Sequence, residues 1–503
     1  MRRFGDRLIL RCMRCMGGAA CVWCVLCALL VASAPALAEP GPALHTCRLR
    51  ALEHAALCGH LSRPLDPERP LGTLIDVHFV VLPAVARKKK PDPVFFFAGG
   101  PGQSAIDLAG QVGVLLGRFS NRRDIVLIDQ RGTGRSAPLQ CGDEPPTMPL
   151  RESADVAAQL VRLRACRQRL MALPYGDLRQ FTTRLAAQDT DAVRRALGAP
   201  RINLVGASYG TRVALDYMRQ FPQAVRRVVL DGAVTPDMVL PASFSPDVQA
   251  AFDAMLGGCE HDAVCASHYP RLRAQWHALL ASLPREVVVR HPVTALEEHL
   301  TLTREMLAGL VRLPLYVPVL ASALPLALAD AAQGRFTPLF GLVSALGGGR
   351  GVTLAQGMHF SVICAEDMPR LASSHETPGA DFGDAYLALY RQVCADWPRA
   401  PVPAAFYTMP PAPAATLILS GGADPAAPPR HGARVAQALG AKARHVIVAE
   451  AGHGLLGLGC MKDVVFRFVD AQTDDEALKI DASCVAALPR PRVFVPVGAR
   501  AQP

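Results

Sequence analysis

The feature that most constrains how this chain can fold is a turn with a glycine at each end, Gly-Ala-Ser-Tyr-Gly at 206–210. The turn directly follows an apolar run at 202–205 and directly precedes residues whose apolar positions recur at helical spacing. The flanking glycines allow the backbone to bend sharply enough to present the hydroxyl of Ser208. This strand–turn–helix setting is typical of a nucleophilic serine at the edge of a parallel sheet, and a capping serine in a tight turn is the alternative.

Other apolar runs predict further strands of the same sheet. Residues 74–82 alternate between apolar and polar, as in a strand that is buried on one face. Short, largely apolar runs, typical of strands that are buried on both faces, occur at 94–97, 125–128, 202–205 and 228–230, and the sheet pattern resumes at 416–419 and 445–448. Helical patterns lie between these runs, including one at 191–197 that Gly198 and Pro200 close. Strands that alternate with helices favour a largely parallel sheet with helices on both faces.

The alternation stops after Gly232 and resumes at 416–419. The residues between are rich in Leu, Ala and Pro and predict a mainly helical insertion, with helices at 266–283 and 303–311. We therefore expect one sheet domain with a helical cap inserted late in the chain and a last helix at about 461–471. The expected parts are a signal segment at 1–38, the first part of the core at 39–236, the cap at 237–410 and the second part of the core at 411–503.

The N-terminus predicts a secretory signal. An arginine-rich start leads into an apolar stretch at 17–31, which small residues up to Ala38 follow. We expect cleavage after Ala38 and a periplasmic or secreted protein. An uncleaved membrane anchor is the alternative, although the apolar stretch is short for a full span and no second one follows.

Cysteine usage agrees with export. Five of the 15 cysteines lie inside the signal segment, which leaves an even number in the remaining chain. An even count in an oxidising compartment favours disulfides. Spacing does not establish which cysteines pair. Because the cysteines fall into sequential neighbours, we propose Cys47–Cys58, Cys141–Cys166, Cys259–Cys265, Cys364–Cys394 and Cys460–Cys484.

The charge pattern argues against nucleic acid as a partner. The formal net charge is +10, but a large share of it lies within the first fourteen residues. The rest of the chain has no basic stripe interleaved with aromatic residues, and the dense basic run at 87–90 is typical of a solvated loop. We expect neither a nucleic-acid partner nor a stable membrane partner, and the oligomeric state stays open.

A serine hydroxyl is a poor nucleophile unless a base takes its proton. Where a sheet carries such a serine, the acid and the histidine follow it in chain order, on loops after late strands. Asp424 follows the strand at 416–419, and His453 follows the strand at 445–448 between two glycines. We therefore predict that His453 is the base and that Asp424 orients it.

Three other residues compete for these roles. His431 lies within the helix that follows Asp424, and His445 begins a strand, at the wrong edge of the sheet for contact with Ser208. Asp231 also ends a strand and is the alternative acid.

Acyl chemistry also needs donors for the developing oxyanion. The strand at 94–97 leads into Ala98 and a Gly-Gly-Pro-Gly turn at 99–102. The backbone N–H of Gly100 could join that of Tyr209 as an oxyanion donor, and a simple loop is the alternative.

Three motifs now carry a resemblance to a known family. The chain resembles the proline iminopeptidase group of α/β-hydrolases in three places. They are the turn at 99–102, the run Asp-Gln-Arg-Gly-Thr-Gly-Arg-Ser at 129–136, and the serine turn with Thr211. The match is closest to its larger exported, tripeptidyl-aminopeptidase-like branch and is weakest in the cap. The resemblance implies an α/β-hydrolase fold, removal of N-terminal residues from short peptides with a free N-terminus, and no metal or organic cofactor. The family usually has a histidine where this chain has Ala98, which puts the shape of the pocket in doubt.

An exopeptidase needs carboxylates that hold the substrate's free amine. The tryptophan–glutamate motif that smaller iminopeptidases carry in the cap is missing here. The exported branch often shows a pattern similar to residues 363–367, so the resemblance makes Glu366 and Asp367 candidates for amine binding. The alternative is that both are structural acids beside a disulfide. Asp129 and Arg131 are expected to form a buried ion pair below the site.

No other chemistry competes in the sequence. The chain has no His-Glu-x-x-His motif, no phosphate-binding Gly-rich loop with Lys, and no zinc-like cysteine spacing beyond the signal segment. An esterase or lipase-like hydrolase with the same triad is the main alternative to an aminopeptidase, and a binding protein that kept the fold is another. We expect activity to rise as His453 loses its proton, near the pH where an ordinary imidazole titrates. The number of residues released stays open.

Overall fold

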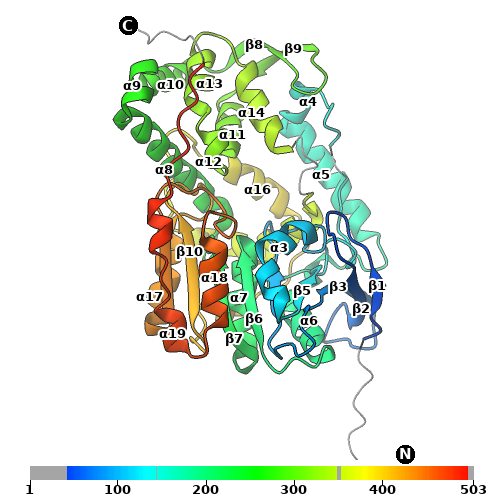
Figure 1. Cartoon of the computed structure of the whole chain (residues 1–503). Helices are drawn as coiled ribbons and strands as arrows, with labels where there is room; N and C mark the ends of the chain where they lie inside the picture. The colour runs from blue at the N-terminus through cyan, green and yellow to red at the C-terminus, as the bar shows by residue number, and fades with distance from the viewer. Residues whose placement is uncertain (1–41, 143, 348–352, 497–503) are drawn as a thin grey trace, which may run out of the picture. The chain divides into compact units, whose positions relative to one another are not determined.

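A nine-stranded sheet organises the computed structural model, which describes residues 42–142, 144–347 and 353–496 (Figure 1). The strands follow one another across the sheet in the order β1-β2-β3-β5-β4-β6-β7-β10-β11. Their bounds are His45–Cys47, Ala56–Pro64, Leu74–Leu82, Ile125–Ile128, Val94–Phe97, Ile202–Ala207, Val225–Asp231, Thr416–Gly421 and Ala443–Val448, in that order. Strands β1 to β3 pair antiparallel, β3 joins β5 antiparallel, and the six strands from β5 to β11 are parallel.

Every strand predicted from an apolar run is present, and three helices lie against each face of the sheet. Alternate residues of each strand point to opposite faces, so Phe95 and Phe96 of β4 belong to different hydrophobic clusters. One face carries α6 (Thr183–Ala196), α7 (Tyr209–Gln220) and α17 (Pro429–Leu439). The other face carries α3 (Ala109–Leu115), α18 (Met461–Asp470) and α19 (Asp474–Leu478). This arrangement confirms the predicted fold class.

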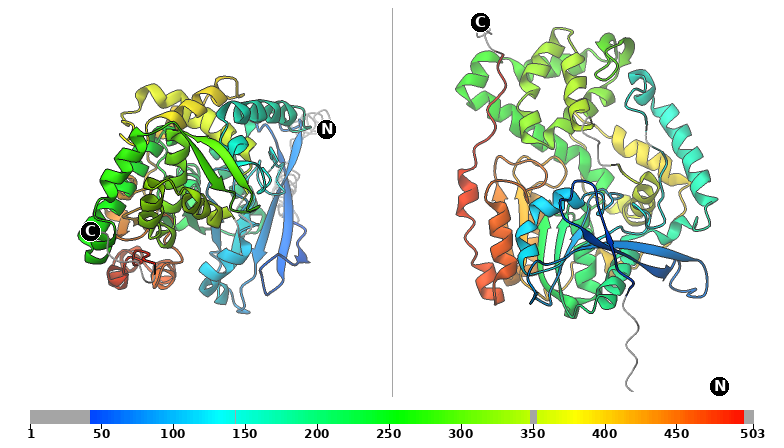
Figure 2. Two further views of the ribbon diagram at one scale, coloured as in Figure 1. Left: turned by 90° about the horizontal axis from the view of Figure 1, so that it is seen from above. Right: turned by 45° about the vertical axis from the view of Figure 1, so that its right-hand side comes forward.

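The chain between β7 and β10 is mainly helical and has a hydrophobic core of its own, centred on Phe252, Trp276 and Leu328. Its larger helices are α8 (Leu240–His261), α9 (Ala263–His268), α10 (Leu272–Ala281), α11 (Arg304–Leu315), α13 (Leu324–Ala332), α14 (Thr337–Gly347), α15 (Gln356–Val362) and α16 (Ala385–Ala395). We call this part of the chain the cap (Figures 1 and 2). The helix expected at 266–283 is interrupted at Tyr269–Pro270, because proline cannot continue a helix from within. The helix expected at 303–311 is α11, which Thr303 caps.

Two features lie outside the sequence predictions. The antiparallel strands β1 and β2 extend the sheet at its N-terminal edge, and a hairpin of β8 (Arg285–Arg290) and β9 (Glu297–Leu302) lies within the cap. In the hairpin, only Val287 and Val289 of β8 are buried, so its apolar pattern is short. Two buried positions are too few to distinguish a strand from a loop by periodicity.

All five proposed disulfides are present, with Cα–Cα distances from 5.1 to 6.5 Å. The predicted signal segment at 1–38 lies outside the described residues. Within the described ranges, none of the helices has both the length and the apolar character needed to cross a membrane.

Candidate active site

Ser208 lies at the sharp turn between β6 and α7. Its backbone has φ 54° and ψ −125°, a conformation that L-residues rarely adopt and that functional sites often hold. Glycine is required on both sides of the serine. A Cβ at Gly206 would lie 2.5 Å from Gly210 O, and a Cβ at Gly210 would overlap Phe97 O. The turn therefore raises Ser208 above the carboxyl end of the sheet.

Hydrogen bonds to the strand ends hold this turn in place. The N–H of Ser208 donates to Asp231 O at 2.8 Å, which ties the turn to the neighbouring strand β7. Thr211 Oγ1 donates to Ser208 O at 2.6 Å and accepts from the N–H of Val234 at 2.8 Å. The strained conformation of Ser208 is thus held from two directions.

Asp424 and His453 form a hydrogen-bonded pair beyond the ends of β10 and β11. Asp424 Oδ2 lies 2.7 Å from His453 Nδ1, and Asp424 Oδ1 accepts the N–H groups of Ala426 and Ala427. The Asp424 carboxylate is fully buried, whereas the His453 side chain is 16% exposed. With Nδ1 bound to the carboxylate, Nε2 is the nitrogen left to act as a base.

The pair shifts the pKa of both groups. Burial alone would raise the pKa of Asp424, but the adjacent imidazole and the two backbone N–H groups lower it below its ordinary value. Burial alone would lower the pKa of His453, but the Asp424 carboxylate outweighs burial and raises it above 6.5. The pair therefore favours an ionised Asp424 and a basic His453.

Ser208, Asp424 and His453 follow strands that end at the same edge of the sheet, with β7 between β6 and β10. Gly232, which follows β7, lies close enough to the pair that a Cβ there would be 3.0 Å from His453 Cε1. Within the described residues, no hydrogen bond joins Ser208 to His453. Such bonds are often long before a substrate is present.

The competing candidates have other partners. His431 is fully buried, and its Nε2 lies 2.9 Å from Asp247 Oδ2. His445 Nε2 lies 3.0 Å from Ser420 Oγ. The Asp231 carboxylate accepts the N–H groups of Leu455 and Leu456 at 2.8 to 3.0 Å, so it holds the loop that follows His453.

The Gly-Gly-Pro-Gly turn runs beside the serine. A Cβ at Gly99 would lie 3.1 Å from Ser208 Cβ, and the N–H of Gly99 donates to Gln103 Oε1 at 3.0 Å. Gly100 has φ 109°, a left-handed conformation that glycine adopts without strain. Tyr209 is the first residue of α7, where the helix offers its N–H no acceptor. The oxyanion roles of Gly100 and Tyr209 stay predictions that this placement suits.

Glu366 and Asp367 lie in the interior, in a π-helical turn at Ile363–Asp367. Both oxygens of Asp367 pair with the fully buried Arg212 of α7 at 3.1 Å, and Oδ1 also accepts the N–H of Leu240. Glu366 accepts from the N–H and the hydroxyl of Thr183, both at 2.7 Å. Burial raises the pKa of Glu366 to about 8. These interior partners do not support amine binding by the two acids, which stays a prediction.

The expected ion pair between Asp129 and Arg131 is wrong. Arg131 pairs instead with Asp189 of α6, at 2.7 and 3.0 Å. Asp129 accepts from Ser104 Oγ at 2.6 Å and from two backbone N–H groups. The two side chains therefore have different buried partners, although only Gln130 separates them in the sequence.

One neighbour of His453 was not anticipated. Tyr316, directly after α11, lies edge-to-face against the imidazole with ring centroids 5.3 Å apart, and its carbonyl accepts the N–H of His453 at 3.0 Å. Tyr316 lies 137 positions before His453 in the sequence, and no motif marks it. The contact therefore could not be read from local pattern.

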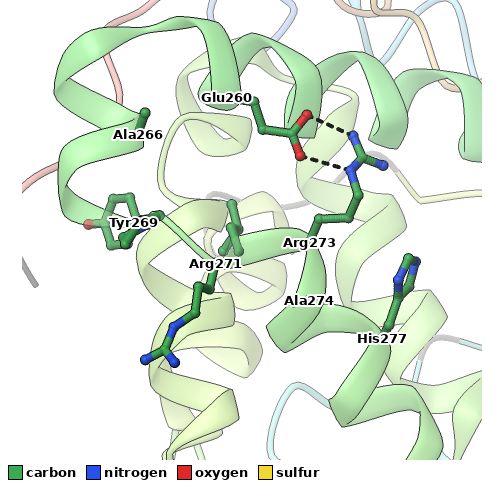
Figure 3. A pocket seen from close by; sticks show the side chains of 9 residues that line it. Glu260, Ala266, Tyr269, Arg271, Arg273, Ala274 and His277 are labelled. Atoms are coloured by element: carbon green, nitrogen blue, oxygen red, sulfur yellow. Dashed lines mark hydrogen bonds and ion pairs between the residues drawn. The ribbon is translucent and has the colours of Figure 1, made fainter. Parts of the chain in front are cut away.

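A hollow on the outer cap does not compete as the site (Figure 3). It lies over α8 to α10, and its Glu260 and Arg273 form a two-pronged ion pair at 2.8 and 3.2 Å. Its one carboxylate is thus already paired with an arginine of the same lining. Among the described residues, no group of three or more His, Cys, Asp or Glu side chains could hold a metal ion.

Two family models match the chain. Residues 92–262, which include Gly100, Ser208 and Tyr209, match the model described as the alpha/beta hydrolase fold. Residues 380–484, which include Asp424 and His453, match the model described as TAP-like protein.

Individual relatives match this chain at about 30% sequence identity and over less than half of its length. The serine protease Hip1 of Mycobacterium tuberculosis is 31% identical over 231 residues, which cover 42% of this chain and 42% of that protein. The tripeptidyl aminopeptidase of Streptomyces lividans is 30% identical over 192 residues, which cover 36% of this chain and 35% of that protein. The chain thus matches less than half the length of these relatives. The solved proline iminopeptidase of Mycobacterium smegmatis is 14% identical, with a TM-score of 0.37 over 82% of this chain and 97% of that one.

Proposed function

We propose that this chain is a serine aminopeptidase of the α/β-hydrolase family, because residues 92–262 match the alpha/beta hydrolase model and residues 380–484 match the TAP-like model. Its substrates would be short peptides with a free N-terminus, from which it releases N-terminal residues. Relatives named serine protease and tripeptidyl aminopeptidase support this substrate class.

The proposed mechanism divides the reaction between the strand ends. Ser208 Oγ attacks the scissile carbonyl while His453 Nε2 takes its proton, and Asp424 stabilises the imidazolium that forms. The N–H groups of Gly100 and Tyr209 would donate to the oxyanion. Collapse of the tetrahedral intermediate breaks the C–N bond, and His453 gives its proton to the leaving amine. Water, deprotonated by His453, then hydrolyses the acyl-enzyme and restores Ser208.

The observation that carries the proposal is the Asp424–His453 hydrogen bond of 2.7 Å at the sheet edge that also presents the strained Ser208. A buried carboxylate that holds one imidazole nitrogen leaves the other to serve as the base. In the proposal, Asp231 positions His453 by binding the backbone of the next two residues.

We also propose that the protein acts in the periplasm or outside the cell. Five disulfides persist only in an oxidising compartment, which supports export. The signal segment at 1–38 that would direct export has the charged, apolar and small-residue order of a secretory signal.

A fluorogenic panel tests the proposal directly. The purified chain is offered Pro-, Ala- and Ala-Ala-Pro-amides with free and with acetylated N-termini, and simple esters, beside a Ser208→Ala control. We expect cleavage of the free-amine amides only, abolished in the control, and the fastest amide would give the number of residues released. Ester cleavage without amide cleavage would identify an esterase. Failure of the wild type to react with a fluorophosphonate probe would identify a protein that kept the fold without catalysis.

A further inference from the structure

We propose that Arg312 of the cap recognises a carboxylate of the substrate and thereby determines which peptides are cleaved. The inference rests on the proposed function, because it concerns side chains that lead to the proposed base of the same serine. Arg312 lies on α11, four residues before Tyr316, so the two side chains lie on the same face of the helix. Tyr316 in turn contacts His453.

A continuous row of cap side chains leads from the base to the oxyanion turn. We call Tyr316, Arg312, Tyr386, Tyr390 and His359 the cap row. The Arg312 guanidinium lies 6.0 Å from the ring centroid of Tyr316 and 4.8 Å from that of Tyr386. Stacking on aromatic faces holds the charge of Arg312 in one place without neutralising it.

The row continues to the other side of the serine. The hydroxyls of Tyr386 and Tyr390 lie 3.5 Å apart, and the Tyr390 hydroxyl lies 2.7 Å from His359 Nε2. His359 Nδ1 lies 3.1 Å from the carbonyl oxygen of Pro101, directly after Gly100. One end of the row therefore contacts His453, and the other contacts Pro101, the residue after Gly100. In the proposal, a peptide bound at Ser208 extends along the row.

Arg312 still has donors to offer. Among the described residues it has no carboxylate partner, and its polar neighbour is the Tyr386 hydroxyl, which can occupy only one of its donors. Arg312 is half-buried, and 38% of Tyr386 is exposed. Arg304, two turns earlier on the same helix, donates to the carbonyl oxygens of Ala380 and Asp381. Buried arginines elsewhere in the chain, such as Arg212, are paired with acids. Arg312 is thus a held cation with free donors beside the reacting centre.

The charge of Arg312 selects between the ends of a peptide. A guanidinium repels the substrate's free amine and binds a carboxylate through two parallel hydrogen bonds. The carboxylate could be the C-terminus of a short peptide or an acidic side chain near the scissile bond. Arg312 lies outside both matched segments, 92–262 and 380–484, so the family models do not account for it.

Paired substrates test the inference. The first pair is a free-amine tetrapeptide with a C-terminal carboxylate and the same peptide as its C-terminal amide. The second pair is an amidated tetrapeptide with Glu or with Gln after the scissile bond. We expect the wild type to favour the carboxylate in at least one pair by about 10- to 100-fold in kcat/KM, the range of a charge-assisted bond. The pair that shows the preference identifies the source of the carboxylate.

Variants assign the preference to Arg312. Arg312→Met should reduce the preference to about 3-fold or less. Arg312→Lys should keep part of it, because lysine keeps the charge but cannot donate two parallel hydrogen bonds as a guanidinium does. The matched control Arg304→Met, on the same helix, should keep the full preference. Labelling of each variant by a fluorophosphonate shows that its site is folded.

Two results would overturn the inference: a wild type that cleaves both members of each pair equally, or an undiminished preference in a folded Arg312→Met. Either result leaves the aminopeptidase proposal standing if free-amine peptides are cleaved in a Ser208-dependent way. If only esters are cleaved, the aminopeptidase proposal fails. The Arg312 comparison then uses monoesters of dicarboxylic acids against neutral esters, with the same two results as its criteria.

Discussion

At the scale of single residues, the proposed chemistry depends on which nitrogen of His453 is free and at what pH it is neutral. The Asp424 carboxylate binds Nδ1 and raises the pKa of His453 above 6.5. Only the neutral imidazole can take a proton from Ser208, so activity should increase with pH through this raised pKa. This refines the expectation from the sequence, which placed the rise at the pH of an ordinary imidazole.

Replacing Asp424 by Asn should lower kcat by about 10⁴-fold, because the amide no longer stabilises the imidazolium and favours the wrong tautomer. The carboxylate charge would also be gone, and burial alone lowers the pKa of His453. The rise in the pH profile should therefore move to lower pH than in the wild type. Profiles of kcat/KM from pH 5 to 9 measure both effects, and a melting curve shows that the variant is folded. An unshifted profile would contradict the assigned role.

The sequence indicated the candidate site residues that a local pattern marks and missed the neighbours that only the fold brings close to them. Glycine spacing around Ser208 and a strand end before His453 are local, so both could be found from the chain alone. Tyr316 contacts His453, and Arg312 lies next to Tyr316, but both belong to a cap helix and its end that are far from His453 in the sequence. Asp129 and Arg131 were paired because they are close in sequence, whereas their partners come from other elements.

At the scale of elements, three segments meet at Glu366. It lies in the π-helical turn at Ile363–Asp367 and accepts from Thr183, the first residue of α6. The Thr183 hydroxyl also lies 2.7 Å from the Tyr209 hydroxyl, at the start of α7. The acid pair at 366–367 thus connects α7, the helix that begins directly after Ser208, to the cap side of the fold, a role that explains its burial.

Glu366→Gln should weaken the dependence of stability on pH. The pKa of Glu366 is about 8 in the fold, against an ordinary value of 4.5. Between these values the folded state keeps a proton that the unfolded state has lost, so raising the pH through this window lowers the free energy of unfolding. The wild type should therefore lose more Tm between pH 5 and pH 8.5 than Glu366→Gln does.

The raised pKa of His453 acts in the same direction in both proteins and cancels in this comparison. Glu376→Gln, which removes a partner of Arg430 instead, is the matched control and should follow the wild-type slope. Equal slopes in the wild type and Glu366→Gln would show that Glu366 is not held protonated.

Element prediction succeeded where the apolar pattern is local. The parallel strands and α18 follow from runs of apolar residues, whereas the single helix predicted at 266–283 is two helices, α9 and α10, which separate at Pro270. The hairpin β8–β9 was missed because its strands are defined by pairing with each other. The π-helical turn at Ile363–Asp367 was also missed. Its backbone hydrogen bonds span one residue more than those of an α-helix, and the amino-acid composition does not show this difference.

At the scale of the molecule, the C-terminal segment returns from the core to the cap (Figures 1 and 2). After α19 and a short turn at Ser483–Ala487, the chain runs along the cap helices. The N–H of Phe494 donates to Ser322 O at 3.0 Å, and the Tyr269 hydroxyl donates to Phe494 O at 2.9 Å. Val493 and Val495 pack against the hydrophobic core of the cap.

Removing residues 489–503 should loosen the cap more than the core. We expect faster hydrogen exchange in α9 and in the Ser322 region, and little change in β6 and β10. The hydrogen bonds and apolar contacts described for the segment lie on the cap, and the ion pair of Arg490 with Glu450 reaches only the loop after β11. Phe494→Ala keeps the backbone bonds and removes a side chain that is 53% exposed, so it should exchange like the wild type. Unchanged exchange after truncation would show that the segment does not hold the cap.

The disulfides also bear on how the protein is made. The two cysteines of each bond are between 6 and 30 residues apart, and each bond closes before the next one along the chain begins. A polypeptide threaded through a pore from its N-terminus would thus deliver every cysteine immediately before or after its final partner. Once a cleaved signal segment has taken its five cysteines away, an oxidant that joins cysteines in order of arrival would produce the native set. The proposed export therefore predicts that an oxidase suffices for maturation, without an isomerase to break and remake bonds.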